Sequence, residues 1–286
     1  MIGNGMTFAS SRVAMAVEKR SLRKVVSGAV LALGLLLFKL KGFILLIAAK
    51  FKPLFVNPFE GFGVAQLWTA GVSMVVSLFA YAVKWGFWFG LGLVLLILIH
   101  ELGHAIVIRA KGLRAGAMVF IPFIGGAVTL KDQPRSVYVD AQIGLAGPIL
   151  GTIAAFVALG LYQWTGLGLY LGIAYAGFII NLLNLMPIGP LDGGRIAAAI
   201  TKWIWVLGVV IVFFVMVWQR NPLLLLILIL GIFQIGKAIR GPKDDTFYNI
   251  TPLQRTLVAV VYFLLVLLVG YESLVTHWEV ERLLTQ

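Results

Sequence analysis

The sequence predicts an all-α polytopic membrane protein, with about seven transmembrane helices, a peripheral or re-entrant N-terminal segment and a small membrane-dipping β-hairpin near residues 117–130. Three observations predict this class. Of the 286 residues, 61% are hydrophobic and 12% are charged, whereas soluble domains are about half apolar and a quarter charged. Long apolar runs fill most of the chain. Basic residues flank these runs, where they orient membrane helices.

A transmembrane helix needs about 20 apolar residues, with about 17 as a practical minimum. Most of the apolar runs reach this length, some of them narrowly. The predicted spans, in chain order, are 64–83, 86–108, 143–162, 168–187, 203–219, 222–239 and 256–271.

The first apolar run, 25–49, is not counted as a span. Lys39 and Lys41 interrupt it, and each lysine at a bilayer centre costs about 2.5–3.5 kcal/mol. A full crossing would also place the basic N-terminal residues outside, against the positive-inside rule. We therefore predict a peripheral or re-entrant segment.

Charge asymmetry predicts how the spans are oriented. The connection 109–140 carries five basic residues and two aspartates, and the tail after Gly270 carries three glutamates. The positive-inside rule places that connection in the cytoplasm and, by alternation, the tail outside. We expect an integral protein of a prokaryotic cell membrane.

The stretch 117–130 is apolar but too short and too interrupted to span. Pro122 and the pair Gly125-Gly126 are typical of turns, and the neighbouring Val, Phe and Ile residues favour strands. A hairpin dipping into the membrane edge is the predicted structure, and an ordinary apolar loop is the alternative.

The chain has a net charge of +12 and no cysteine. Because the basic residues flank apolar runs and form no compact basic domain, we expect contact with the lipid bilayer and no nucleic-acid partner. Without cysteine, disulfides and thiolate ligands are excluded. The predicted regions are the N-terminal basic segment 1–62, the transmembrane core 63–200, and the C-terminal helices with a short tail, 201–286.

The most specific motif is His100-Glu101-Leu102-Gly103-His104, which ends an uncharged run that begins at Trp85. Residues four apart share one face of a helix, so both imidazoles can bind one metal ion. The glutamate is rotated by about 100° and can reach a water on that ion. Ionisable groups within membrane helices are costly and tend to be functional.

A catalytic zinc ion usually has three protein ligands and one position open for water. His277 lies in the tail predicted outside, and no glutamate occurs between the motif and Glu272. Among the carboxylates inside or bordering the later spans, Asp192 stands out, since it follows a helix end broken by Pro187 and Pro190 on the predicted cytoplasmic side. Taken alone, its Pro-Leu-Asp-Gly segment is typical of a turn; beside the two histidines, the ligand interpretation is favoured.

This pairing of HExxH in a membrane helix with Asn-x-x-Pro-x-x-Pro-Leu-Asp-Gly-Gly about ninety residues later resembles the site-2 protease family, the intramembrane zinc metalloproteases. The resemblance covers about 67–195 and includes the hairpin and a glycine-rich segment, 144–151. It implies that Glu101 is the catalytic glutamate and that Asn184 helps to hold the substrate or the oxyanion. Asn181 matches less securely and is interpreted as a hydrogen bond between helices. The implied ligands of one zinc ion per chain are His100, His104 and Asp192.

The resemblance implies zinc-dependent intramembrane proteolysis with membrane-protein helices as substrates. The charge pattern predicts that the active site lies toward the cytoplasm. A homodimer is left open. The alternative is a non-catalytic relative of the same fold that binds membrane clients. A metal transporter is disfavoured, because few other polar residues occur along the spans.

Overall fold

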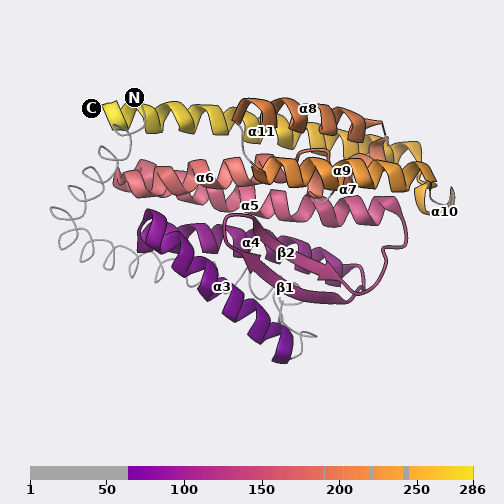
Figure 1. The fold of residues 1–286 in the computed structure, drawn as a ribbon, viewed down its shortest axis with the longest axis horizontal. Helices are drawn as coiled ribbons and strands as arrows, with labels where there is room; N and C mark the ends of the chain where they lie inside the picture. The colour runs from indigo at the N-terminus through magenta and orange to yellow at the C-terminus, as the bar shows by residue number, and fades with distance from the viewer. Residues whose placement is uncertain (1–63, 190, 202, 220–221, 241–244, 286) are drawn as a thin grey trace. The chain divides into compact units, whose positions relative to one another are not determined.

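Helices account for most of the residues described by the computed structural model, which are 64–189, 191–201, 203–219, 222–240 and 245–285. All of them belong to one unit of the chain, Pro58–Gln286. The predicted segment 25–49 and region 1–62 lie outside these residues. The elements labelled in Figure 1 are, in chain order, α3 (Val64–Trp85), α4 (Phe87–Ala110), β1 (Ala115–Ile121), β2 (Gly125–Leu130), α5 (Val137–Thr165), α6 (Gly168–Asn184), α7 (Asp192–Ile200), α8 (Ile204–Gln219), α9 (Pro222–Arg240), α10 (Asp245–Tyr248) and α11 (Pro252–Thr285).

Local sequence signals set several helix ends. Gly86, with a φ of 92°, separates α3 from α4, because glycine adopts this conformation without steric cost. Helix α5 begins after Ser136, whose hydroxyl accepts a hydrogen bond from the Val139 N–H at 3.4 Å. It ends at Gly166, which has a left-handed φ of 69°.

Among the described residues, four helices are long and apolar enough to cross a membrane: Gln66–Trp85, Phe87–Ala110, Val137–Thr165 and Pro252–Thr285. They coincide with four predicted spans. Two other predicted spans fall on shorter apolar helices, Gly168–Asn184 and Ile204–Phe214. The remaining predicted span, 222–239, coincides with α9. The mostly helical, membrane-type fold is confirmed, and the count of seven spans stays a prediction.

Helix α11 continues well past its apolar run, to Thr285. The extension has no proline, and pairs one helical turn apart support it: Arg282 donates to Glu279 at 2.7 Å, and His277 lies 3.4 Å from Glu281. The tail expected after Gly270 is therefore helical.

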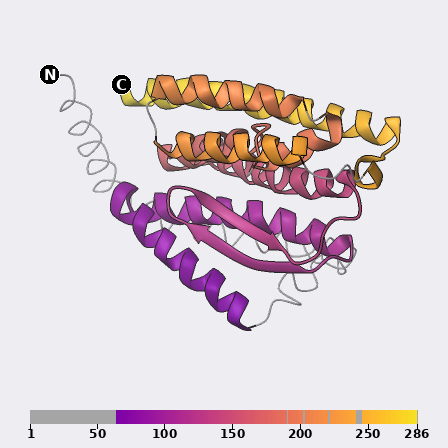
Figure 2. The ribbon, with the colours of Figure 1, turned by 45° about the vertical axis from the view of Figure 1, so that its right-hand side comes forward.

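The predicted hairpin is confirmed. Strands β1 and β2 pair antiparallel, with Phe120 opposite Gly126. Their connection is a tight turn in which the Ile124 N–H donates to the Ile121 carbonyl at 3.1 Å. Pro122 precedes Phe123, which has a φ of 65°, so Phe123 occupies the turn position usually taken by glycine. Figure 2 shows the hairpin lying along α4 beside α3.

Side chains of α3 close the outer edge of β1. Ser73 Oγ accepts the Phe120 N–H at 3.1 Å, and Tyr81 Oη accepts the Phe123 N–H at 3.1 Å. The Phe123 ring meets Tyr81 and Trp85 edge-on, with ring centroids 5.3 and 5.7 Å apart. These contacts hold the hairpin tip at the C-terminal end of α3.

A surface ion pair lies at the other end of the hairpin. Arg114 donates side-chain hydrogen bonds to Asp132 at distances from 2.6 to 3.1 Å. These hydrogen bonds lower the pKa of Asp132 to about 2, so the carboxylate stays charged at neutral pH. Because Arg114 is exposed, the pair contributes little to stability.

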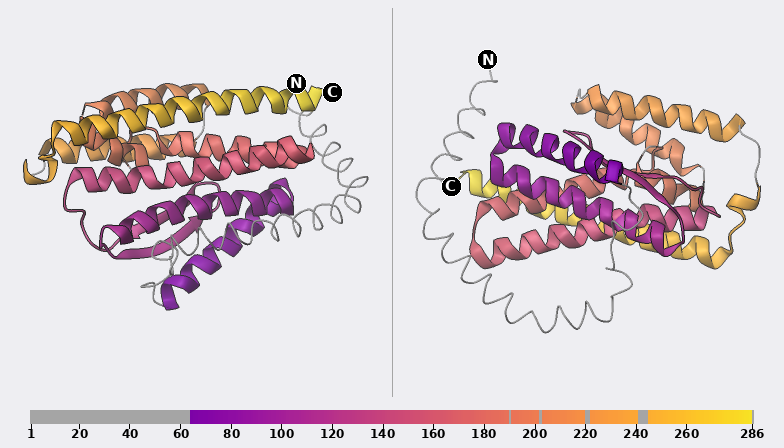
Figure 3. Two further views of the ribbon diagram at one scale, coloured as in Figure 1. Left: turned by 180° about the vertical axis from the view of Figure 1, so that it is seen from behind. Right: turned by 90° about the horizontal axis from the view of Figure 1, so that it is seen from below.

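Helices α4, α5, α6 and α11 pack in series around the main core, as Figures 1 and 3 show from opposite sides. This core includes Phe178, Leu185, Ile196 and Tyr262. Helices α4 and α5 approach closely at Gly103, where an added Cβ would lie 2.4 Å from the Ala146 carbonyl oxygen. Small residues permit such contact between membrane helices.

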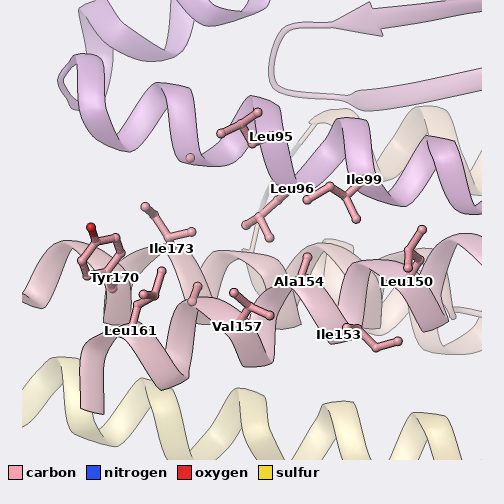
Figure 4. Close-up of a pocket in the computed structure, with 12 residues that line it drawn as sticks. Leu95, Leu96, Ile99, Leu150, Ile153, Ala154, Val157, Leu161, Tyr170 and Ile173 are labelled. Carbon is pink, nitrogen blue, oxygen red and sulfur yellow. The ribbon is translucent and has the colours of Figure 1, made fainter. Parts of the chain in front are cut away.

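An apolar groove of about 350 Å³ runs between α4, α5 and α6, and Figure 4 shows its lining. Except for Tyr170, the lining side chains are aliphatic or absent. The groove offers no metal ligand and suits contact with lipid chains. Ile99, one of its lining residues, immediately precedes His100 in α4.

Candidate metal centre

Helix α4 carries both histidines and the glutamate of the motif into the interior. His100, Glu101 and His104 are only 3%, 3% and 6% exposed. The helical period places His100 and His104 on one face, and their Nε2 atoms lie 3.1 Å apart. Gly147 of α5 passes directly over them, since a Cβ there would lie 2.2 Å from His104 Nε2. Only glycine fits at this position.

Asp192 reaches the same point from a distant part of the chain. It is the first residue of α7, after the break that contains Pro187. Its Oδ2 lies 3.1 Å from His100 Nε2 and 3.2 Å from His104 Nε2. The structure therefore brings together the three side chains proposed as ligands, in a group that could hold a metal ion.

The other nitrogen of each imidazole determines the tautomer. His104 Nδ1 lies 2.7 Å from the Ile143 carbonyl oxygen, and His100 Nδ1 lies 2.9 Å from Asn181 Oδ1. Both oxygens can only accept, so both Nδ1 atoms carry hydrogen and donate. The Nε2 atoms are then left with free lone pairs, as metal-binding histidines require.

The donor atoms fit a metal ion. Two imidazole lone pairs and a carboxylate oxygen converge with edges of 3.1–3.2 Å, an unfavourable arrangement without a cation among them. Zinc bonds of about 2.0–2.2 Å in a tetrahedral site give donor–donor edges of about 3.3–3.5 Å. The triangle is close to this size, so one ion satisfies all three donors together.

Strand β2 determines where Glu101 lies. The Val128 N–H donates to the Glu101 carboxylate, and an added Cβ at Gly126 would lie 2.7 Å from Glu101 Oε1. The second oxygen, Oε2, is buried and has no hydrogen-bond partner. Buried acceptors are rarely left unpaired in this way, which indicates that Oε2 binds water or a reacting group.

Sequence reasoning favoured Asn184 over Asn181, and the structure supports a larger role for Asn181. Asn181 is 2% exposed and contacts His100, whereas no described hydrogen bond joins the half-buried Asn184 to the centre. Asn181 also donates to the Gly177 carbonyl at 2.8 Å, which fixes its amide orientation. The sequence offered one signal for this role of Asn181, namely a polar amide within an apolar helix. It offered no signal for the Ile143 carbonyl, because every residue has a main-chain carbonyl.

The centre and the fold together define a class of protein: a membrane-type helical protein with a buried His–His–Asp group that could hold a metal ion and an adjoining carboxylate. Residues 88–168 match the model of peptidase family M50, the site-2 protease family. The matched segment carries His100, Glu101 and His104, and Asp192 lies beyond it. The predicted family resemblance is confirmed over this segment.

Several curated proteins are similar to this chain over about a third of its length. A zinc metalloprotease of Methanocaldococcus jannaschii is 32% identical over 109 residues, which cover 36% of this chain and 31% of that protein. The putative zinc metalloprotease Rip3 of Mycobacterium tuberculosis is 31% identical over 112 residues, covering 36% and 28%. Stage IV sporulation protein FB of Bacillus subtilis is 31% identical over 107 residues, covering 36% and 37%. The chain thus spans about a third of the length of these relatives.

Proposed function

We propose that this chain is a zinc-dependent protease that hydrolyses peptide bonds of transmembrane substrates. The observation that carries the proposal is the convergence of two imidazole lone pairs and one carboxylate oxygen beside an unpaired glutamate oxygen. The similarity to proteins named zinc metalloproteases supports zinc as the ion. The long apolar helix α4, which carries both histidines and Glu101, supports a membrane setting.

Each side chain has a defined task. His100, His104 and Asp192 hold the ion, which when bound polarises the scissile carbonyl and makes a water molecule more acidic. Glu101 Oε2 takes a proton from the attacking water while the water oxygen forms a bond to the carbonyl carbon. The carbon–nitrogen bond then breaks, and Glu101 returns the proton to the leaving nitrogen. Asn184 remains our candidate for holding the substrate.

Strand β2 is proposed to hold the substrate in an extended form. The Phe120 N–H points away from the hairpin to α3, so its register partner Gly126 also directs its backbone groups outward, at the edge of β2. This edge adjoins Glu101, whereas α3 covers the edge of β1. A substrate helix that unwinds locally could add there as a strand, with its scissile bond near the ion.

The active site is proposed to face the cytoplasm, because the basic connection between α4 and α5 lies beyond the C-terminal end of α4. Water would reach the ion from that end, since the motif lies in the second half of α4. The proposed location is a prokaryotic cell membrane, and the proposed partners are substrate helices and the bilayer, with a homodimer left open.

Two other functions remain as outcomes of the test. A non-catalytic relative would bind membrane clients with the same fold, although it would not need Glu101 beside the ligands. A metal transporter would need further ligands along a pathway, and the described residues contain one such group.

The test is co-expression of single-span substrates with the wild-type chain and with Glu101→Gln, followed by zinc analysis of the purified proteins. Cleavage by the wild type alone, with about one zinc per chain in both, supports the proposal. Zinc-loaded wild type that cuts no substrate but retains clients on purification would favour the binding function. Wild type without zinc would refute the metal centre itself.

A further inference from the structure

Helix α7 presents Asp192 to the metal centre but is only nine residues long. An isolated helix of this length is not stable in itself and depends on tertiary contacts. Because Asp192 is its first residue, any shift of α7 moves the carboxylate relative to the histidines. The contacts that hold α7 therefore determine whether the third ligand is in place.

One set of contacts comes from the transmembrane core. Arg195, one helical turn after Asp192, donates to Asp140 of α5 through Nε at 2.9 Å. At Gly144 of α5, an added Cβ would lie 3.1 Å from the Asp192 carbonyl oxygen. This pairing fixes the side of α7 that faces α5, and the buried Ala197 and Ala199 near the C-terminal end pack in the main core.

The other set comes from beyond residue 195, where the family resemblance ends. Arg255 of α11 donates from one nitrogen to the Ala199 carbonyl at 2.8 Å and to the Ile200 carbonyl at 2.7 Å. Trp205 Nε1 donates to the Gly194 carbonyl at 2.7 Å. The contacts of Arg255 and Trp205 thus hold both ends of α7.

Arginine at this position performs two tasks. The last carbonyls of a helix have no partner within it, and Arg255 satisfies those of Ala199 and Ile200. Its positive charge also lies at the negative end of the α7 dipole. The residue is half-buried, so its loss would leave these carbonyls poorly solvated.

We propose that Arg255 is a positioning residue for the metal centre: by fastening the C-terminal end of α7 to α11, it keeps Asp192 at bonding distance from the ion. The proposal assigns a task in the centre to a helix outside the family match. It rests on the zinc site of the proposed function and does not depend on proteolysis.

The experiment measures the zinc dissociation constant of the full chain in detergent or nanodiscs, by competition with a chromophoric chelator. Arg255→Met keeps an unbranched, though shorter, apolar side chain and removes the donors and the charge, and we expect zinc binding about tenfold weaker or more. Arg255→Lys should recover part of the loss. The matched control is Arg282→Met, at an exposed position of the same helix where the arginine pairs with the half-buried Glu279. This variant should bind zinc as the wild type does.

Making the same substitution in an Asp192→Ala variant distinguishes an effect on the position of Asp192 from a general loss of structure. If Arg255 acts through Asp192, Arg255→Met should weaken zinc binding in the wild type but cause no further loss in Asp192→Ala. Equal losses in both backgrounds, or unchanged affinity in Arg255→Met, would overturn the inference while leaving the zinc site intact. A wild-type chain that binds no zinc would instead overturn the proposed function.

Discussion

The Nδ1 atoms of His100 and His104 face away from the centre, yet their hydrogen bonds decide where the ligand atoms point. Asn181 orients one ring and the Ile143 carbonyl the other. A main-chain carbonyl cannot be removed by substitution, but the amide can. Asn181 is therefore the position at which this control can be tested.

We predict that Asn181→Leu, which is similar in size but lacks the acceptor, weakens zinc binding about 10- to 100-fold, as other losses of outer hydrogen-bond partners do. Asn184→Leu is the control, three residues further along α6, and should leave zinc affinity unchanged. Chelator competition measures both. Equal losses in the two variants would contradict the assignment of Asn181.

Gly126 supports a second prediction at the scale of single residues. A Cβ there would lie 2.7 Å from Glu101 Oε1 and Cγ, so Gly126→Ala should displace the carboxylate without touching the metal ligands. Because general acid–base catalysis contributes about 10²–10⁴-fold, we expect turnover to fall about tenfold or more.

In the Gly126→Ala variant, zinc content should change little. Ala127→Val adds methyl groups at the neighbouring, exposed position of β2 and serves as the control. The measurement is turnover of a single-span substrate by zinc-loaded protein. A loss of zinc together with activity would show that Gly126 supports the ligands and not Glu101.

At the scale of elements, the hairpin shows what sequence can predict. Pro122, the Gly125-Gly126 pair and the flanking apolar residues predicted its place. Its tip could not be predicted, because turn rules assign glycine to the position with positive φ, and Phe123 stands there. The strain of such a residue, about 1–3 kcal/mol, is offset by contacts with Tyr81 and Trp85, which lie about forty residues earlier in the chain.

Apolar runs likewise predicted the long helices but not α7, whose nine residues are too few to form an apolar run of transmembrane length. Arg255 donates to two carbonyls of α7 from more than fifty residues further along the chain, and a contact of such sequence separation cannot be inferred from local pattern. Asp192 could be predicted as a ligand because its motif is specific. The residues that hold it in place could not.

A prediction at this scale concerns the hydroxyl that fastens the hairpin tip. Tyr81→Phe removes the acceptor of the Phe123 N–H but keeps the ring, and should cost about 0.5–1.5 kcal/mol locally. Amide hydrogen exchange at the tip should quicken about 2- to 10-fold. Tyr271→Phe, at an exposed position of α11, is the control, and unchanged exchange in Tyr81→Phe would mean that ring packing alone holds the tip.

At the scale of the whole molecule, a single orientation of the chain in the membrane agrees with the charges of its connections and with the access of water to the metal centre. Placing the basic connection between α4 and α5 in the cytoplasm also places the acidic end of α11 outside, because an odd number of predicted spans separates them. It brings water to the metal centre from the end of α4 nearer to the histidines. A reversed chain would place five basic residues of that connection outside, against the charge rule.

The orientation can be tested with little interference, because the chain has no cysteine. Single substitutions Lys131→Cys, in the connection before α5, and Leu284→Cys, near the end of α11, introduce thiols at exposed positions. A membrane-impermeant maleimide should label Leu284→Cys on intact cells and Lys131→Cys only in inside-out vesicles. The cysteine-free wild type gives the labelling background. The reverse pattern would place the metal centre toward the outside, and labelling of both positions from one side would require an even number of spans between them, contrary to the predicted topology.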